Sequence, residues 1–236
     1  MSDTVQFTID GKPVEGKAGM TILEAADGAG IYIPRLCKGP DLKPRGACRV
    51  CTVMVNGRPQ SACTQPVSEG ALVENETAEL LEFRRALIEM LFAEGNHFCP
   101  FCERSGTCEL QALAYRFGIM APRYPYQFPR REMDASHPDL MLDRNRCILC
   151  GRCVNASRDV DGKTVFDFVG RGVHKRLAVD AEAGLGGTNA DVRDRAAEVC
   201  PVGCILKKRT AYTVPVGLRP YDRQPIGTDI EARKES

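Results

Sequence analysis

The cysteines whose spacing is most specific for one chemistry lie near residue 150. The run reads Cys147-Ile-Leu-Cys150-Gly-Arg-Cys153, and Cys200-Pro follows much later in the chain. Three thiols at two-residue gaps can face one side of a cubane cluster, and a remote Cys-Pro supplies the fourth ligand. Ser157 stands where a two-cluster ferredoxin would continue the run with another cysteine. The pattern therefore predicts a single 4Fe–4S cluster held by these four thiolates.

A second group consists of Cys37, Cys48, Cys51 and Cys63. These four thiols resemble the plant-type ferredoxin set, which binds a 2Fe–2S cluster. Ten residues separate the first two cysteines here, whereas the common plant-type spacing has four. The longer gap resembles that of complex I and hydrogenase relatives. We therefore expect a 2Fe–2S cluster at this group.

The third group is His97, Cys99, Cys102 and Cys108. An imidazole beside three thiols is a plausible fourth ligand of a 4Fe–4S cluster, and it would raise the potential above that of an all-thiolate site. One residue separates His97 from Cys99, where related sites have three, so this ligand is the least regular. The Cys99–Cys102 pair alone would also suit a redox dithiol, but an apolar helix precedes it instead of the strand that such a motif expects.

The same residues also allow other interpretations. Structural zinc is an alternative for any of the three groups, because zinc also takes four thiolates, or three and an imidazole. Cys204 remains unassigned, and a buried free thiol is favoured over a replacement ligand. Arg49, Arg146 and Arg152 stand in or beside the cysteine loops, where they either temper cluster charge or are solvated. No glycine-rich nucleotide loop and no paired carboxylates were identified.

The composition supports metal ligation inside a reducing compartment. The chain has 236 residues and 12 cysteines, and the formal net charge is +1 with both signs mixed. No charge excess suggests a nucleic-acid partner, and neither a secretory signal nor an apolar stretch of membrane-spanning length is visible. We expect a cytoplasmic protein, where thiols stay reduced and bind metal.

The elements around the cysteines at 37–63 are predicted by alternation and turn signals. Residues 5–9 and 52–55 alternate apolar and polar side chains, and each stretch leads to an Asp-Gly or Asn-Gly pair typical of hairpins. Thr21 and Glu24 have the spacing of a capping box, which predicts a helix over 22–29. Strand, strand, helix, cysteine loop and hairpin is the order of a β-grasp ferredoxin.

After this unit the apolar period becomes helical. One predicted helix has an inner face made of Leu80, Phe83, Leu87, Met90 and Leu91, and a second helix begins near Cys108. Residues 165–169 and 173–179 predict a strand pair, and 192–199 predict a helix that ends at the last cluster ligand.

The predicted fold class is α+β, with five segments along the chain. They are a β-grasp 2Fe–2S ferredoxin domain (1–77), a helical one-His/three-Cys 4Fe–4S module (78–118), a linker (119–138), a ferredoxin-like 4Fe–4S domain (139–208) and a tail expected to dock on another subunit (209–236).

With all three groups in order, residues 5–204 resemble the electron-transfer region shared by the large iron–sulfur subunit of complex I, iron-only hydrogenases and some formate dehydrogenases. A chain of this length is similar to the small diaphorase subunits of soluble NAD-reducing nickel–iron hydrogenases. That resemblance implies an electron-transfer subunit of a hydrogen:NAD+ oxidoreductase without a catalytic centre of its own. It also implies a flavin (FMN) and NAD-binding diaphorase partner and the small and large hydrogenase subunits as partners.

Two alternative functions are also compatible with the sequence. The first is an equivalent relay subunit in a formate dehydrogenase or a complex I-like assembly. The second is a zinc-stapled structural or interaction protein with no redox role.

Overall fold

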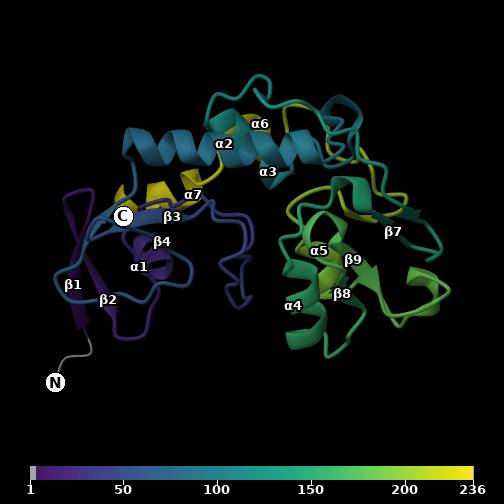
Figure 1. Ribbon diagram of the computed structural model, residues 1–236, viewed down its shortest axis with the longest axis horizontal. Helices are drawn as coiled ribbons and strands as arrows, with labels where there is room; N and C mark the ends of the chain where they lie inside the picture. The colour runs from purple at the N-terminus through teal and green to yellow at the C-terminus, as the bar shows by residue number, and fades with distance from the viewer. Residues whose placement is uncertain (1–3, 236) are drawn as a thin grey trace.

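The computed structural model describes residues 4–235, and its helices and strands follow one another in three regions and a tail (Figure 1). The first region contains β1 (Thr4–Ile9), β2 (Lys12–Lys17), α1 (Ile22–Gly28), β3 (Thr52–Val55), β4 (Arg58–Ser61) and β5 (Leu72–Glu74). The second contains α2 (Ala78–Glu94) and α3 (Glu109–Arg116). The third contains β6 (Met133–Asp134), β7 (Leu140–Asp143), α4 (Arg152–Asp159), β8 (Phe166–Val169), β9 (Arg176–Val179), α5 (Arg195–Glu198) and β10 (Ile205–Lys207). The tail holds α6 (Pro220–Arg223) and α7 (Thr228–Glu231).

The first region is a five-stranded sheet in the order β2-β1-β5-β3-β4, with β1 and β5 parallel and the other pairs antiparallel. The predicted hairpins and the helix are confirmed. Thr21 caps α1, because its Oγ1 accepts from the Glu24 N–H at 3.2 Å while the Glu24 carboxylate accepts from the Thr21 N–H at 2.9 Å. The helix packs Ile22 and Leu23 into the apolar core of the sheet.

Helix α2 forms where the sequence predicts it, and its predicted inner face is right only in part, because Leu80 is buried and Leu91 packs against the core but two other members do not. Phe83 and Met90 are 41% and 43% exposed, and Arg84, Ile88 and Glu89 are buried instead. Compared with the predicted orientation, the helix is rotated so that Arg84 points inward, because its guanidinium donates hydrogen bonds to backbone carbonyls of the first region. A pattern of apolar residues cannot predict such hydrogen bonds.

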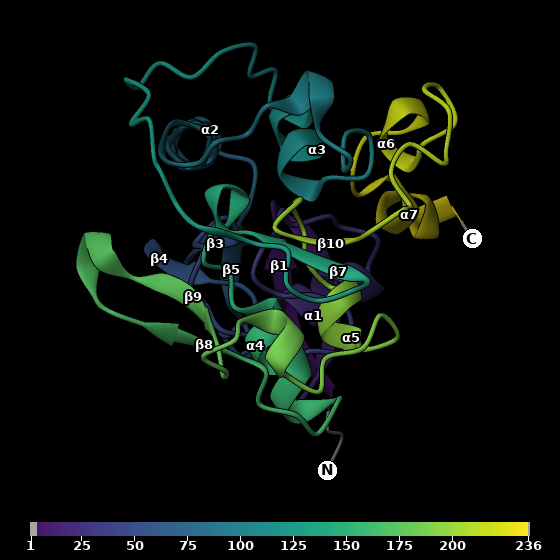
Figure 2. The same ribbon diagram turned by 90° about the vertical axis from the view of Figure 1, so that its right-hand side faces the viewer.

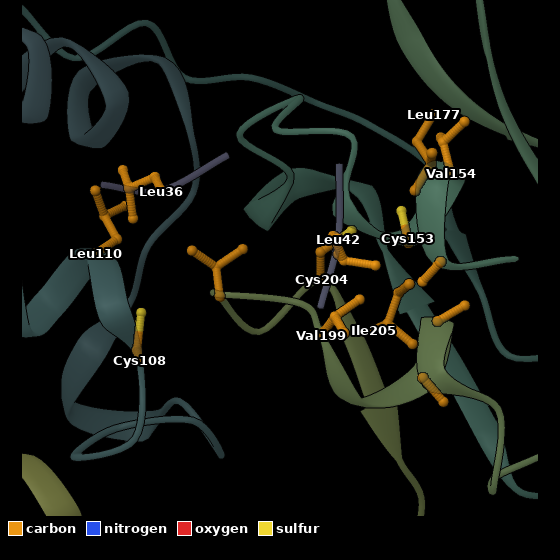
Figure 3. Close-up of a cluster of buried hydrophobic side chains, with 14 of the residues drawn as sticks. Leu36, Leu42, Cys108, Leu110, Cys153, Val154, Leu177, Val199, Cys204 and Ile205 are labelled. Atoms are coloured by element: carbon orange, nitrogen blue, oxygen red, sulfur yellow. The ribbon is translucent and has the colours of Figure 1, made fainter. Parts of the chain in front are cut away.

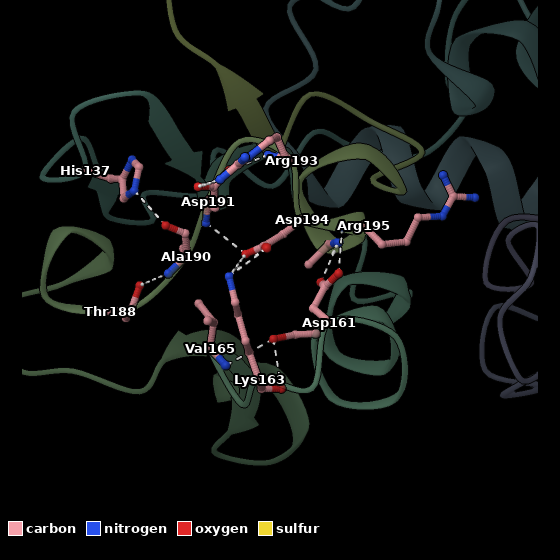
Figure 4. A network of polar contacts seen from close by, with 12 residues as sticks. His137, Asp161, Lys163, Val165, Thr188, Ala190, Asp191, Arg193, Asp194 and Arg195 are labelled. Carbon is pink, nitrogen blue, oxygen red and sulfur yellow. Dashed lines mark hydrogen bonds and ion pairs between the residues drawn. The ribbon is translucent and has the colours of Figure 1, made fainter.

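The third region holds two small sheets, β10-β7-β6 and β8-β9. The strand pair near 165–179 is confirmed, with a short turn at Gly172–His174 inside it. The helix predicted over 192–199 is shorter, running only from Arg195 to Glu198. The Asp161 carboxylate accepts from the N–H groups of Arg195 and Ala196, so the helix begins there (Figure 4).

One apolar core runs across all three regions. Leu36 and Leu42 of the first region belong to the same buried cluster as Leu110 on α3 and Val154 on α4 (Figure 3). The segments that carry the cysteines are therefore held against one another by burial of apolar surface, which is the main stabilising term in folding.

The tail folds back across the chain and returns to the first region. Both views place α6 and α7 beside α3 (Figures 1 and 2). The Arg116 guanidinium donates to the Ile226 carbonyl at 2.8 Å and pairs with Glu231 at 2.5 Å. Gly227 packs on the ring of Tyr32 so closely that a Cβ there would lie 2.4 Å from a ring carbon. The described part of the tail thus binds this chain itself.

Candidate metal centres

The first site is formed by the long loop between α1 and β3, which carries Cys37, Cys48 and Cys51, and by Cys63, which follows β4. Cys37, Cys51 and Cys63 are buried, and Cys48 is partly buried. The Cys37 N–H donates to the Cys48 sulfur at 3.4 Å, and the thiols of Cys37 and Cys51 both contact Cys63. Hydrogen bonds from Cys48 and Cys63 hold the pKa of the Cys37 thiol well below its usual range. The four cysteines predicted as one group are therefore brought together.

Arg84 holds the backbone beside this site, a role that the sequence analysis did not predict. Its guanidinium donates to the carbonyls of Val50, Thr52 and Asn75 at 3.2, 2.8 and 2.8 Å, and Val50 lies between two of the cysteines. Burial lowers the pKa of Arg84 to about 10, so the group stays charged at neutral pH. The signal was an arginine at an inward position of an otherwise apolar helical pattern.

Two of the cysteine loops adopt strained backbone conformations. Arg49, between Cys48 and Cys51, has φ 58°, and Leu149, between Cys147 and Cys150, has φ 53°. Non-glycine residues in the left-handed region cost about 1–3 kcal/mol and cluster at functional sites. The turns aim successive thiols inward, which is what a bound cluster requires of such a loop.

The second site lies between α2 and α3. His97, Cys99, Cys102 and Cys108 line one pocket, together with Phe92 and Arg146. The structure thus brings His97 to the three thiols despite its short spacing to Cys99.

The imidazole of His97 has the chemistry of a ligand. Its ring meets Phe92 edge-on at 5.4 Å between centroids, and its buried Nε2 atom has no hydrogen-bond partner. Burial, together with the nearby charges of Arg146 and Arg131, lowers the pKa of His97 to about 4, so the ring is neutral at pH 7. A neutral imidazole with an unpartnered nitrogen fits coordination of a metal.

The third site lies between α4, the loop before it and the segment after α5. Cys147, Cys150, Cys153 and Cys200 line one pocket, and Cys204 lines it as a fifth thiol. Cys204 is 2% exposed, so it is buried as the sequence favoured, and its thiol contacts the sulfurs of Cys147 and Cys200. The hydrogen bond from Cys204 lowers the pKa of Cys200 to about 6 despite burial.

A polar network fixes the loop that delivers Cys200 (Figure 4). Lys163 pairs with Asp194 at 2.7 Å, just ahead of α5. His137 belongs to the same scaffold, because its Nε2 lies 3.1 Å from the Ala190 carbonyl and its Nδ1 accepts from two backbone N–H groups. His137 is 8% exposed and precedes β7, so it is a buried part of this scaffold.

The second and third sites touch directly. The Glu109 N–H, next to Cys108, donates to the carbonyl of Pro201, next to Cys200, at 2.8 Å. The Arg146 guanidinium lies 3.5 Å from the Cys102 sulfur, against which Gly203 also packs. One backbone hydrogen bond thus joins residues adjacent to a cysteine of each site.

The donor sets suit iron–sulfur clusters. Metal analysis of the purified protein would distinguish these clusters from bound zinc. Four thiols, as at the first and third sites, and three thiols with an imidazole, as at the second site, are known cluster environments. Within residues 4–235, no group of three or more Cys, His, Asp or Glu side chains is arranged as the shell of a single metal ion.

Three families match successive parts of the chain. Residues 2–78 match the family described as a 2Fe–2S iron–sulfur cluster binding domain. Residues 84–123 match the iron–sulfur binding region of NADH-ubiquinone oxidoreductase-G, and residues 140–206 match a 4Fe–4S single cluster domain. The chain therefore carries one two-iron domain followed by iron–sulfur regions of the four-iron kind.

A full-length relative decides the family. The chain is 45% identical to the gamma subunit of the NAD-reducing hydrogenase HoxS of Cupriavidus necator, over 94% of this chain and 95% of that one. The chain belongs to this family of hydrogenase iron–sulfur subunits. It is also similar, at 46% identity and a TM-score of 0.93 over 98% of both chains, to a chain in the crystal structure of an NAD+-reducing NiFe-hydrogenase in the H2-reduced state.

More distant relatives share only part of their length with it. The mitochondrial 78 kDa subunit of NADH-ubiquinone oxidoreductase from Candida albicans is 32% identical over 88% of this chain, which spans 29% of that protein. The alpha subunit of an NADPH-Fe(3+) oxidoreductase from Geobacter sulfurreducens is 34% identical over 86% of this chain, which spans 24% of it. No helix within residues 4–235 is both long and apolar enough to cross a membrane.

Proposed function

We propose that this chain is the electron-relay subunit of an NAD-reducing hydrogenase. Cys37, Cys48, Cys51 and Cys63 would hold one 2Fe–2S cluster; His97, Cys99, Cys102 and Cys108 would hold a 4Fe–4S cluster; and Cys147, Cys150, Cys153 and Cys200 would hold another. When bound, these groups take up and release single electrons. The protein supplies the ligands, excludes water from them and sets their distances.

The observation that carries this proposal is the direct contact between sites. The 2.8 Å bond from the Glu109 N–H to the Pro201 carbonyl connects the second site to the third. The Arg152 guanidinium reaches the Lys38 carbonyl, beside Cys37, at 3.1 Å and so connects the first site to the third. A structural scaffold would have no need to bring its three metal-binding loops into mutual contact.

The family relation supplies the partners in this proposal. The chain would receive electrons from a nickel–iron hydrogenase module, made of a small and a large subunit, and deliver them to a flavin- and NAD-binding diaphorase subunit, or carry them in reverse. By this relation, the hydrogen-splitting and hydride-transferring centres would lie in those partner subunits.

The test is anaerobic purification of the full chain, with analysis of iron, sulfide and zinc, followed by EPR of a dithionite-reduced sample. We expect about ten irons per chain and signals from one two-iron and two four-iron sites. About six irons would remove the His97 site from the proposal. Stoichiometric zinc with no reduced-state signal would leave a structural scaffold and end the electron-transfer assignment.

A further inference from the structure

Arg152 lies at the point where the three sites meet. Its side chain is 2% exposed and forms a two-pronged ion pair with Glu109, at 2.5 and 2.6 Å. The same guanidinium donates to the Lys38 carbonyl at 3.1 Å and lies 3.5 Å from the Val199 carbonyl. Gly39 leaves the room for this, since a Cβ there would lie 3.2 Å from the arginine Cδ.

Each partner of Arg152 is the immediate neighbour of a cysteine in a different site. Lys38 follows Cys37 of the first site, and Glu109 follows Cys108 of the second. Val199 precedes Cys200 of the third site, and Arg152 itself precedes Cys153. A single buried side chain therefore contacts the ligand loops of all three sites.

The two charges of this ion pair differ in how much water surrounds them. Arg152 is buried, whereas the Glu109 side chain is 24% exposed and better solvated. Charges inside a protein are screened less than charges in water, so the guanidinium acts over a longer range than its carboxylate partner. A positive charge favours the reduced, more negative state of a nearby redox centre.

We propose that the Arg152–Glu109 pair is a positioning and potential-setting pair shared by the three sites. This inference rests on the proposed function. Arg152 holds the three ligand loops in register and raises the reduction potential of each site. Glu109 offsets part of that effect, most strongly at the site of Cys108, its neighbour in the chain.

The test compares Arg152→Met, Glu109→Gln and the double variant in the full chain, with iron content and EPR redox titrations of each signal. Arg152→Met should lower all three midpoint potentials, and Glu109→Gln should raise them, with the largest shift at the second site. The double variant removes both charges, so its potentials should return toward those of the unmodified chain.

Arg158→Met is the matched control, because Arg158 lies on the same helix and its side chain is 58% exposed. It should move no potential. Arg152→Lys keeps the charge and loses the fork, so its potentials should stay near those of the unmodified chain, and it serves if the methionine variant does not fold. Unchanged potentials in both Arg152→Met and Glu109→Gln would overturn the inference, as would a double variant that stays as far shifted as Arg152→Met. Loss of all reducible iron from the unmodified chain would instead refute the proposed function.

Discussion

If His97 binds a cluster as proposed, an imidazole in place of a thiolate makes the second site less negative than the third. His97 is neutral in its pocket, whereas a cysteine ligand binds as a thiolate. The potential of a cluster falls as the negative charge of its ligands grows. We therefore predict that His97→Cys retains about four irons at this site but lowers its potential, as measured by redox titration of its EPR signal.

His174 offers the control, because it is an exposed histidine in a turn between β8 and β9. His174→Cys should change neither iron content nor potential. If His97→Cys and His97→Ala both kept the unmodified potential and iron content, His97 would not be a ligand.

Cys204 adds a hydrogen-bond donor to the third site. Its contacts with Cys147 and Cys200, together with burial, raise the pKa of Cys204, so it remains a thiol beside two proposed cluster ligands. Hydrogen bonds to cluster sulfurs stabilise the reduced state. Cys204→Ala should keep the cluster and lower its potential, whereas Cys204→Ser keeps a donor and should stay close to the unmodified value.

Redox titration of the third-site EPR signal separates these variants. Loss of four irons in Cys204→Ala, with Cys200→Ala retaining them, would instead make Cys204 the ligand.

At the scale of residues, the sequence predicts which cysteines form each group, but it does not predict which side chains surround them. Fixed gaps such as those from Cys147 to Cys153 place thiols on one short loop, so local geometry brings them together. The contact of Cys204 with Cys147 and that of Arg152 with Glu109 join segments far apart in the chain, and no local pattern encodes them.

At the scale of elements, helix α2 ties the first site to the second. Its Arg84 side chain, 1% exposed, supplies hydrogen bonds to three carbonyls of the β-grasp region, and the helix leads directly to His97. Each buried carbonyl left without a donor costs about 1–3 kcal/mol. The arginine therefore contributes both to the stability of this junction and to the shape of the loop around Val50.

We predict that Arg84→Met lowers the free energy of unfolding by about 3 kcal/mol, because it leaves buried carbonyls unsatisfied. Denaturant unfolding of the full chain would measure this loss. Glu82→Gln, on the same helix with a side chain 56% exposed, should change stability by less than about 0.5 kcal/mol. An equal effect from both substitutions would contradict the role assigned to Arg84.

The elements themselves were largely predictable, because turns and caps are local. The capping box of Thr21 and the Asn56-Gly57 hairpin formed as expected. The inner face of α2 was not, because three backbone carbonyls of another region outweigh the apolar side chains of Phe83 and Met90. The short α5 departs for the same reason, since the side chain of Asp161 decides where it begins.

At the scale of the whole molecule, the tail connects the end of the chain to its first region. The guanidinium groups of Arg35 and Arg116 lie 5.5 and 4.7 Å from the ring centre of Tyr32, and Gly227 packs against the same ring. The tail was predicted to dock on another subunit. That prediction stays untested, and the described residues show contacts within the chain.

We predict that Gly227→Ala lowers the melting temperature, because its methyl group would overlap the Tyr32 ring and its φ of +96° already disfavours a side chain. Gly217→Ala is the matched control, since Gly217 has φ +88° with nothing within 4 Å of a Cβ. The control should cost about 1 kcal/mol and Gly227→Ala about 1–3 kcal/mol more. Equal losses in a thermal melt would show that the tail adds nothing at Tyr32.

The closure of Tyr32 by Gly227 has a consequence for how the protein is made. Translation runs from the N-terminus to the C-terminus, so Gly227 emerges from the ribosome long after the loop that carries Cys37. The loop that follows Tyr32, with Cys37 in it, therefore lacks its final cover throughout synthesis. A cluster inserted early at the first site would therefore be in place before this part of the tail packs on Tyr32.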